Sequence, residues 1–175
     1  STALSELEPN TFAALTRLET LIVSLNQIEI LKKGTFNGLN NLAYLFLEQN
    51  QIREIEANAF ENMSQILFLS LYDNLLETWK NTTFFGLTGL KDLNLKNNRI
   101  KSLQKSTFLC LVSLKSLYLN DNGIESIEAG TLDGLFSLEI LDLSSNSIAK
   151  IEPGAFRYLR QLTYLILKKN ALESI

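Results

Sequence analysis

Histidine is absent from this chain of 175 residues, and cysteine occurs once, at Cys110. Without histidine, no Ser-His-Asp or Cys-His catalytic centre and no histidine-ligated metal site is possible. One cysteine cannot form an intrachain disulfide or a thiolate zinc cluster. The apolar runs are too short to span a membrane, and a net charge of −3 leaves no basic footprint for nucleic acid. We therefore expect no catalytic residues, metal or cofactor, no nucleic-acid partner, and no membrane contact by this segment.

Leucine and asparagine, by contrast, are in excess, with 36 and 17 residues. Hydrophobic residues make up 46% of the chain, which is enough to bury a core. Seven asparagines recur at a spacing of 24 residues: Asn26, Asn50, Asn74, Asn98, Asn122, Asn146 and Asn170. Self-similarity at such a period is the signature of a repeat architecture, in which neighbouring units bury a continuous core.

Each of these asparagines closes the frame LxxLxLxxN. A partial unit occupies residues 1–17, and complete frames begin at residues 18, 42, 66, 90, 114, 138 and 162. Further apolar columns follow the asparagine without insertions. One column reads Leu31, Ile55, Trp79, Leu103, Ile127, Ile151 and Ile175, and another reads Phe12, Phe36, Phe60, Phe84, Phe108, Leu132 and Phe156. The whole chain, residues 1–175, is therefore expected to form one array.

The frame has a direct physical interpretation. Its fourth and sixth positions alternate with variable ones, which is the period of a short strand. Each unit should add one strand to a parallel sheet of about seven strands, and the rest of the unit carries the chain back. The asparagine side chain should satisfy backbone groups in the turn that leaves each strand. For this reason we expect Asn98→Ala to cost several kcal/mol of stability and the neighbouring Asn97→Ala to cost little.

This pattern resembles the leucine-rich repeat family, in particular its 24-residue extracellular class. The chain is similar to the ectodomains of Toll-like receptors and of variable lymphocyte receptors. The resemblance implies an α/β-type solenoid, a horseshoe with a concave parallel sheet and irregular or 3-10 segments on the convex side. The cysteine-rich caps of the class are missing, so we expect a fragment of a longer ectodomain.

The resemblance also implies a function. We expect non-enzymatic ligand recognition by an extracellular or cell-surface protein, most similar to innate-immune receptors. Cell adhesion and neuronal or matrix signalling form the alternative. The ligand would be a protein or a microbial or glycan molecule held on the concave face.

The outward strand positions are free of the repeat's constraints and so carry the binding prediction. Aromatic residues gather on two adjacent units, an apolar group lies near the C-terminal end, and polar residues fill the middle. The candidate ligand-binding residues are Tyr44, Phe46, Phe68, Tyr72, Asp92, Asn94, Lys96, Tyr118, Ile140, Tyr164 and Ile166. Clustered aromatics with a polar rim are typical of binding hot spots, although strand propensity alone also places aromatics on a sheet.

Two carboxylates among the outward positions, Asp92 and Asp142, could be imagined as a catalytic pair. No base, nucleophile or phosphate-binding loop accompanies them, and they are predicted to lie two strands apart. We interpret them as solvated polar positions.

The return segments hold the remaining candidates. The sequons at Asn62 and Asn81 predict glycosylation away from the concave face. A convex patch of unusually apolar residues surrounds the single cysteine: Phe85, Leu109, Cys110, Val112 and Phe136. Half-buried packing explains this patch, and self-association through it or through the uncapped ends is the sharper alternative.

Overall fold

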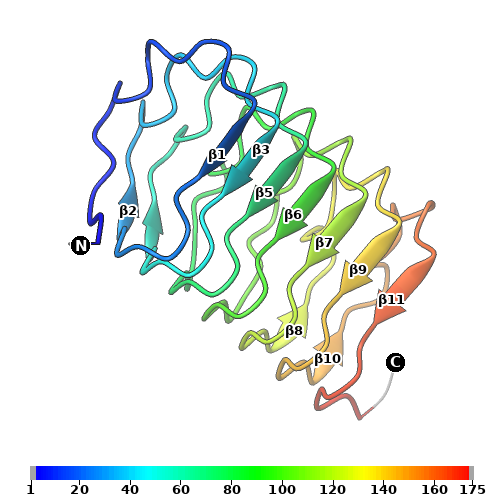
Figure 1. Ribbon diagram of the computed structural model, residues 1–175. Coiled ribbons are helices and arrows are strands. Elements are labelled where there is room, and N and C mark those ends of the chain that lie inside the picture. Colours follow the sequence, from blue (N-terminus) through cyan, green and yellow to red (C-terminus); the bar gives the residue numbers. More distant parts are fainter. Residues whose placement is uncertain (1–2, 174–175) are drawn as a thin grey trace.

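Seven short parallel strands form one sheet in chain order in the computed structural model, which describes residues 3–173. The strands are β1 (Thr20–Ile22), β3 (Tyr44–Phe46), β5 (Phe68–Ser70), β6 (Asp92–Asn94), β7 (Ser116–Tyr118), β9 (Ile140–Asp142) and β11 (Tyr164–Ile166). Figure 1 shows them in a row along one side of the molecule, with the return segments behind them. The predicted seven-stranded solenoid is confirmed.

Every strand pairs with its neighbour at a constant offset of 24 residues, so that Leu45 faces Leu69 and Leu69 faces Leu93. These central leucines are fully buried. Because successive side chains on a strand point to opposite faces, the residues on either side of each leucine point outward. We call this outward side the sheet face.

The asparagine series satisfies backbone groups between turns, as predicted. The Nδ2 of Asn98 donates to the carbonyl oxygens of Leu71, at 3.0 Å, and Leu95, at 3.1 Å, while its Oδ1 accepts a hydrogen bond from the Leu76 amide at 3.0 Å. Asn97, whose substitution is expected to cost little, has a contact of its own. Its backbone is left-handed, with φ of 53°, and its Nδ2 donates to Asp73 Oδ1 at 2.7 Å.

The return segments pack aromatic rings of successive turns against one another. The rings of Phe36 and Phe60 stack at 5.7 Å between centroids, and those of Phe84 and Phe108 at 6.0 Å. The backbone here is irregular and built from single turns, such as the one closed by the Leu39 amide on the Phe36 carbonyl. The expected 3-10 character is limited to such turns, since no continuous 3-10 helix occurs within residues 3–173.

Four two-residue strands on the return side were not predicted. They pair as β2 (Ile30–Leu31) with β4 (Glu54–Ile55) and β8 (Ser126–Ile127) with β10 (Lys150–Ile151). The two pairs are separated by the turns that carry Trp79 and Leu103, so this second ladder is interrupted in the middle of the molecule. Ile175, the last member of the same apolar column, lies outside the described residues.

Candidate ligand-binding surface

The predicted aromatic residues of the first strands meet on the sheet face. β3 and β5 place the rings of Phe46 and Phe68 5.1 Å apart at an angle of 38°. Tyr44 pairs in register with Phe68 and is 43% exposed. The ring of Tyr72 instead carries the Lys96 ammonium group, 5.8 Å from its centroid. Three of the four aromatic residues therefore form one surface, and the fourth borders the polar middle.

Polar side chains occupy the centre of the sheet face. Lys96 Nζ lies 3.6 Å from Asp121 Oδ2, and the Lys96 amide donates to Asn94 Oδ1 at 3.1 Å. Asp92 lies at the start of β6, and Tyr118 on β7 pairs in register with Asn94. This region is hydrogen-bonded and charged, so it separates two apolar surfaces on the same face.

The second apolar surface lies on β9 and β11. Ile140 pairs in register with Tyr164, and Ile166 pairs with Asp142. Tyr164 is 63% exposed, the largest exposure among the predicted aromatic positions. The structure thus brings these three predicted residues together as well, at the opposite end of the sheet from the Phe46–Phe68 pair.

The two imagined catalytic carboxylates do not meet. Asp92 is on β6 and Asp142 on β9, with β7 between them. Asp142 Oδ1 accepts hydrogen bonds from the Ser144 amide at 2.9 Å and the Ser144 hydroxyl at 2.6 Å. Among residues 3–173, no group of three or more histidine, cysteine, aspartate or glutamate side chains could hold a metal ion.

Two polar residues of the sheet face were not predicted as site residues. Ser24 Oγ and Glu48 Oε2 are shielded from solvent, and neither has a hydrogen-bond partner among the described residues. Both belong to the outward column that follows the third core position of each unit. The signal in the sequence that could have indicated them is Glu48 itself, an acidic residue with no basic residue at the adjacent positions of this column.

The glycosylation candidates lie in the return segments. Asn62 and Asn81 are both exposed. Asn62 has a left-handed backbone with φ of 68°, and Thr83, the hydroxyl residue of the second sequon, is buried with its Oγ1 accepting a hydrogen bond from the Lys80 amide at 3.1 Å. Sugars at either position would leave the sheet face free.

The convex patch is exposed at its apolar members but not at its cysteine. Phe85, Leu109 and Phe136 are 54%, 51% and 53% exposed. Cys110 is half-buried, and its Sγ donates to the Phe84 carbonyl oxygen at 3.1 Å. Burial raises the pKa of the Cys110 thiol, which keeps it protonated and poorly reactive at neutral pH.

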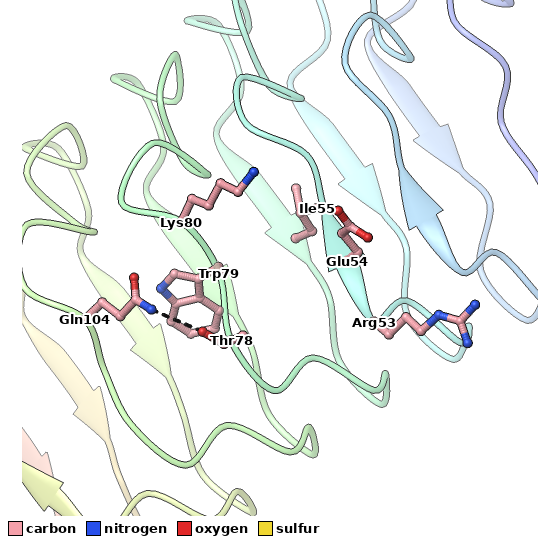
Figure 2. A pocket seen from close by; sticks show the side chains of 7 residues that line it. All are labelled: Arg53, Glu54, Ile55, Thr78, Trp79, Lys80 and Gln104. Atoms are coloured by element: carbon pink, nitrogen blue, oxygen red, sulfur yellow. Dashed lines mark hydrogen bonds between the residues drawn. The ribbon is translucent and has the colours of Figure 1, made fainter.

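A cavity of about 430 Å³ opens where the second ladder is interrupted. It is lined by Arg53, Glu54, Ile55, Thr78, Trp79, Lys80 and Gln104. Figure 2 shows the Lys80 side chain extending toward Ile55, and the hydrogen bond of 3.2 Å from Gln104 Nε2 to Thr78 Oγ1. Trp79 is only 5% exposed, and its Nε1 donates inward to Thr107 at 3.2 Å. The cavity therefore offers little aromatic surface, and the sheet face is the stronger candidate.

Comparisons with known proteins agree with this geometry. The family model described as "Leucine rich repeat" matches residues 1–52, 16–76, 68–124 and 113–172. The matched protein in the solved structure of the TLR13–ssRNA13 complex is 32% identical in sequence to this chain and superposes with a TM-score of 0.94. The match covers 98% of this chain and 24% of that one. The matched protein in the Toll–Spatzle complex of Drosophila is 27% identical in sequence to this chain and superposes with a TM-score of 0.81. That match covers 96% of this chain and 26% of the other. No match was found among curated proteins.

Two points follow from these matches. This chain spans about a quarter of the length of either solved protein. One of the two complexes contains single-stranded RNA, so the expectation that nucleic acid is excluded as a partner is not supported. Separately from the matches, the described residues 3–173 contain no helical segment with the length and hydropathy of a membrane span.

Proposed function

This chain belongs to the leucine-rich repeat family, and from that premise we propose that it recognises a ligand on its sheet face without catalysing a reaction. The proposal is supported by the contact between Phe46 and Phe68 beside the exposed Tyr44. Rigid aromatic side chains supply large contact areas at low entropic cost and dominate the energetics of many interfaces. Asp92, Asn94 and Lys96 form the polar border of this surface.

The biological setting that we propose is innate-immune recognition outside the cell or at its surface. The two solved relatives, a Toll-like receptor and Toll, support this setting. One is described in a complex with RNA, and the other in a complex that serves Drosophila development and innate immunity. For this chain the proposed ligand is a protein or a microbial or glycan molecule. Glycosylation at Asn62 or Asn81 belongs to the same proposal.

The test replaces both contacting rings at once. The double variant Phe46→Ser with Phe68→Ser should fold, because neither side chain is fully buried. Truncating an aromatic anchor commonly costs about 2 kcal/mol of binding free energy, which is roughly thirtyfold in affinity. We expect the double variant to lose at least about tenfold in affinity for ligands captured from serum and microbial extracts.

The matched control is Phe85→Ser with Leu109→Ser, which removes a similar apolar area from the convex patch. It should bind like the parent chain. If the sheet-face variant binds normally and the convex variant does not, recognition occurs on the convex side and the proposal is wrong.

A further inference from the structure

One edge of the short strand β4 is open where the second ladder is interrupted. The Glu54 amide donates to the Glu29 carbonyl oxygen at 3.4 Å, and the Glu56 amide donates to the Leu31 carbonyl oxygen at 2.9 Å, so both amides point toward β2. The backbone groups of successive residues in a parallel strand point to alternate edges. The Ile55 amide and carbonyl therefore point away from β2, toward the next turn of the chain.

The next turn does not supply partners for this edge. In a continued ladder the Lys80 amide would donate to the Ile55 carbonyl oxygen, as the corresponding amide of the preceding turn donates to β2. It donates instead to Thr83 Oγ1 on its own turn, at 3.1 Å. Among the described residues, no backbone hydrogen bond joins residues 53–55 to residues 78–80. Two backbone segments thus face each other without the hydrogen bonds of a ladder.

The space between these segments is open to a ligand. The cavity of about 430 Å³ has residues 53–55 on one wall and residues 78–80 on the other. Figure 2 shows the side chains of both segments around this opening. Its volume falls within the roughly 300–1,000 Å³ that is usual for ligand pockets. An accessible strand edge with free backbone groups is a template for pairing with another chain.

The cavity also carries one cation and one anion on opposite walls. Lys80 and Glu54 are both exposed, and neither forms an ion pair within residues 3–173. Arg53, the other charged residue of the lining, is paired with Glu29. A charged ligand group between the two walls would approach a group of its own sign. A side-chain amide suits both, because its oxygen can accept from Lys80 and its nitrogen can donate to Glu54.

We propose that an extended segment of a protein partner enters this cavity and pairs its backbone with the open edge of β4, placing a glutamine or asparagine between Glu54 and Lys80. Strand addition at a sheet edge takes its affinity from main-chain hydrogen bonds and its specificity from alternate side chains. The inward side chains of the segment must be small, because the buried side chains of Ile55 and Trp79 line the cavity. This site lies on the return side and does not rest on recognition at the sheet face.

The experiment compares two peptides with the same side chains and different backbone donors. Acetyl-Thr-Ala-Gln-Ala-Thr-amide is titrated into the ¹⁵N-labelled chain, and the amide shifts and hydrogen-exchange rates of Ile55 and Thr78 are followed by NMR. The second peptide has every backbone amide N-methylated. We expect saturable shifts and slower exchange of the Ile55 amide with the first peptide, and an affinity at least about tenfold lower with the second.

A pair of variants places the peptide in the cavity. Thr78→Tyr puts a bulky side chain at the cavity and should weaken binding of the first peptide at least about tenfold. Ser102→Tyr makes a similar change at the equivalent exposed position of the next turn, which does not line the cavity, and should bind like the parent chain. Melting temperatures verify that both variants fold.

Three results would each overturn strand addition at β4. They are equal affinity of the parent chain for the two peptides, unchanged shifts and exchange at Ile55 and Thr78, and normal binding by a folded Thr78→Tyr variant. If Thr78→Tyr does not fold, the comparison of the two peptides on the parent chain still decides.

Discussion

The side chain of Asn98 makes hydrogen bonds to four backbone groups, two on its own turn and two on the turn before it. Asn98→Ala would leave the buried Leu76 amide unpaired, while the Leu71 and Leu95 carbonyl oxygens would keep their second donors, Asn74 and Asn122. An unpaired buried amide costs about 1–3 kcal/mol, and each of the other lost hydrogen bonds about 0.5–1.5 kcal/mol. We expect the free energy of unfolding, measured with urea, to fall by roughly 3 kcal/mol or more.

Asn97→Ala should lower the free energy of unfolding by a smaller amount than Asn98→Ala. Its left-handed backbone disfavours alanine, so a loss of about 1 kcal/mol is expected. Arg99→Ala changes an exposed side chain and should have an effect within about 0.5 kcal/mol. Equal stabilities of the Asn98 and Arg99 variants would contradict the structural role of the asparagine series.

Gly86 is required for a different reason, the close approach of two backbone segments. Its φ is +101°, and a Cβ atom there would lie 2.3 Å from the Phe60 carbonyl oxygen. Gly86→Ala should therefore destabilise the chain by roughly 3 kcal/mol in urea unfolding, since both backbone strain and overlap with backbone must be relieved. Gly123→Ala is the control. The nearest atom to its added Cβ would lie at an ordinary 3.6 Å, so its unfolding midpoint should hardly change.

At the scale of elements, the sequence predicts the long ladder and misses the short ones. The leucines of β5 and β6 alternate with outward residues, and this period is visible without coordinates. β4 and β8 are two residues long and contain no period. They pair only where the neighbouring turn also forms a strand, and the turns that carry Trp79 and Leu103 do not. The sequence pattern, which is the same apolar column in all of these turns, does not distinguish them.

The candidate site divides in the same way. The contact of Phe46 with Phe68 follows from their columns and from a constant register. The unpaired state of Glu48 does not, because it depends on where long neighbouring side chains point. Lys96 illustrates the difficulty, since its ammonium group lies over the Tyr72 ring and near Asp121, a choice of partners that its place in the column does not reveal.

Trp79 holds together the turns where the second ladder is interrupted. Its ring lies 5.6 Å from Phe84 and 6.3 Å from Phe108, and its Nε1 donates to the buried Thr107. Trp79→Leu would leave a cavity and remove that hydrogen bond, at a cost of about 3–5 kcal/mol. Thermal unfolding followed by circular dichroism should show a clear fall in the melting temperature.

Gln104→Ala removes an exposed side chain that lines the adjacent cavity and serves as the control. It should melt like the parent chain. If the melting temperature fell by a comparable amount in both variants, the lining of the cavity, and not the packing of the indole ring, would be what stabilises this region.

At the scale of the whole molecule, the two sequons and the candidate binding residues lie on different sides. Chain produced in a secretory host should carry sugar at Asn62 or Asn81, detectable as added mass, and enzymatic removal of the sugar should leave ligand affinity unchanged. Asn62→Gln with Asn81→Gln is the matched variant without sequons. An unmodified mass from such a host would contradict the proposed extracellular setting.

The hydrogen bonds between turns all run along the stack, as from the Leu95 amide to the Tyr118 carbonyl and from the Leu119 amide to the Asp142 carbonyl. A force that pulls the two ends of the chain apart would load the bonds of an end turn before those of its neighbours. Each turn holds 24 residues, so its release would lengthen the chain by about 80 Å. Under tension the molecule should therefore unfold one turn at a time, in a series of extension steps of equal length.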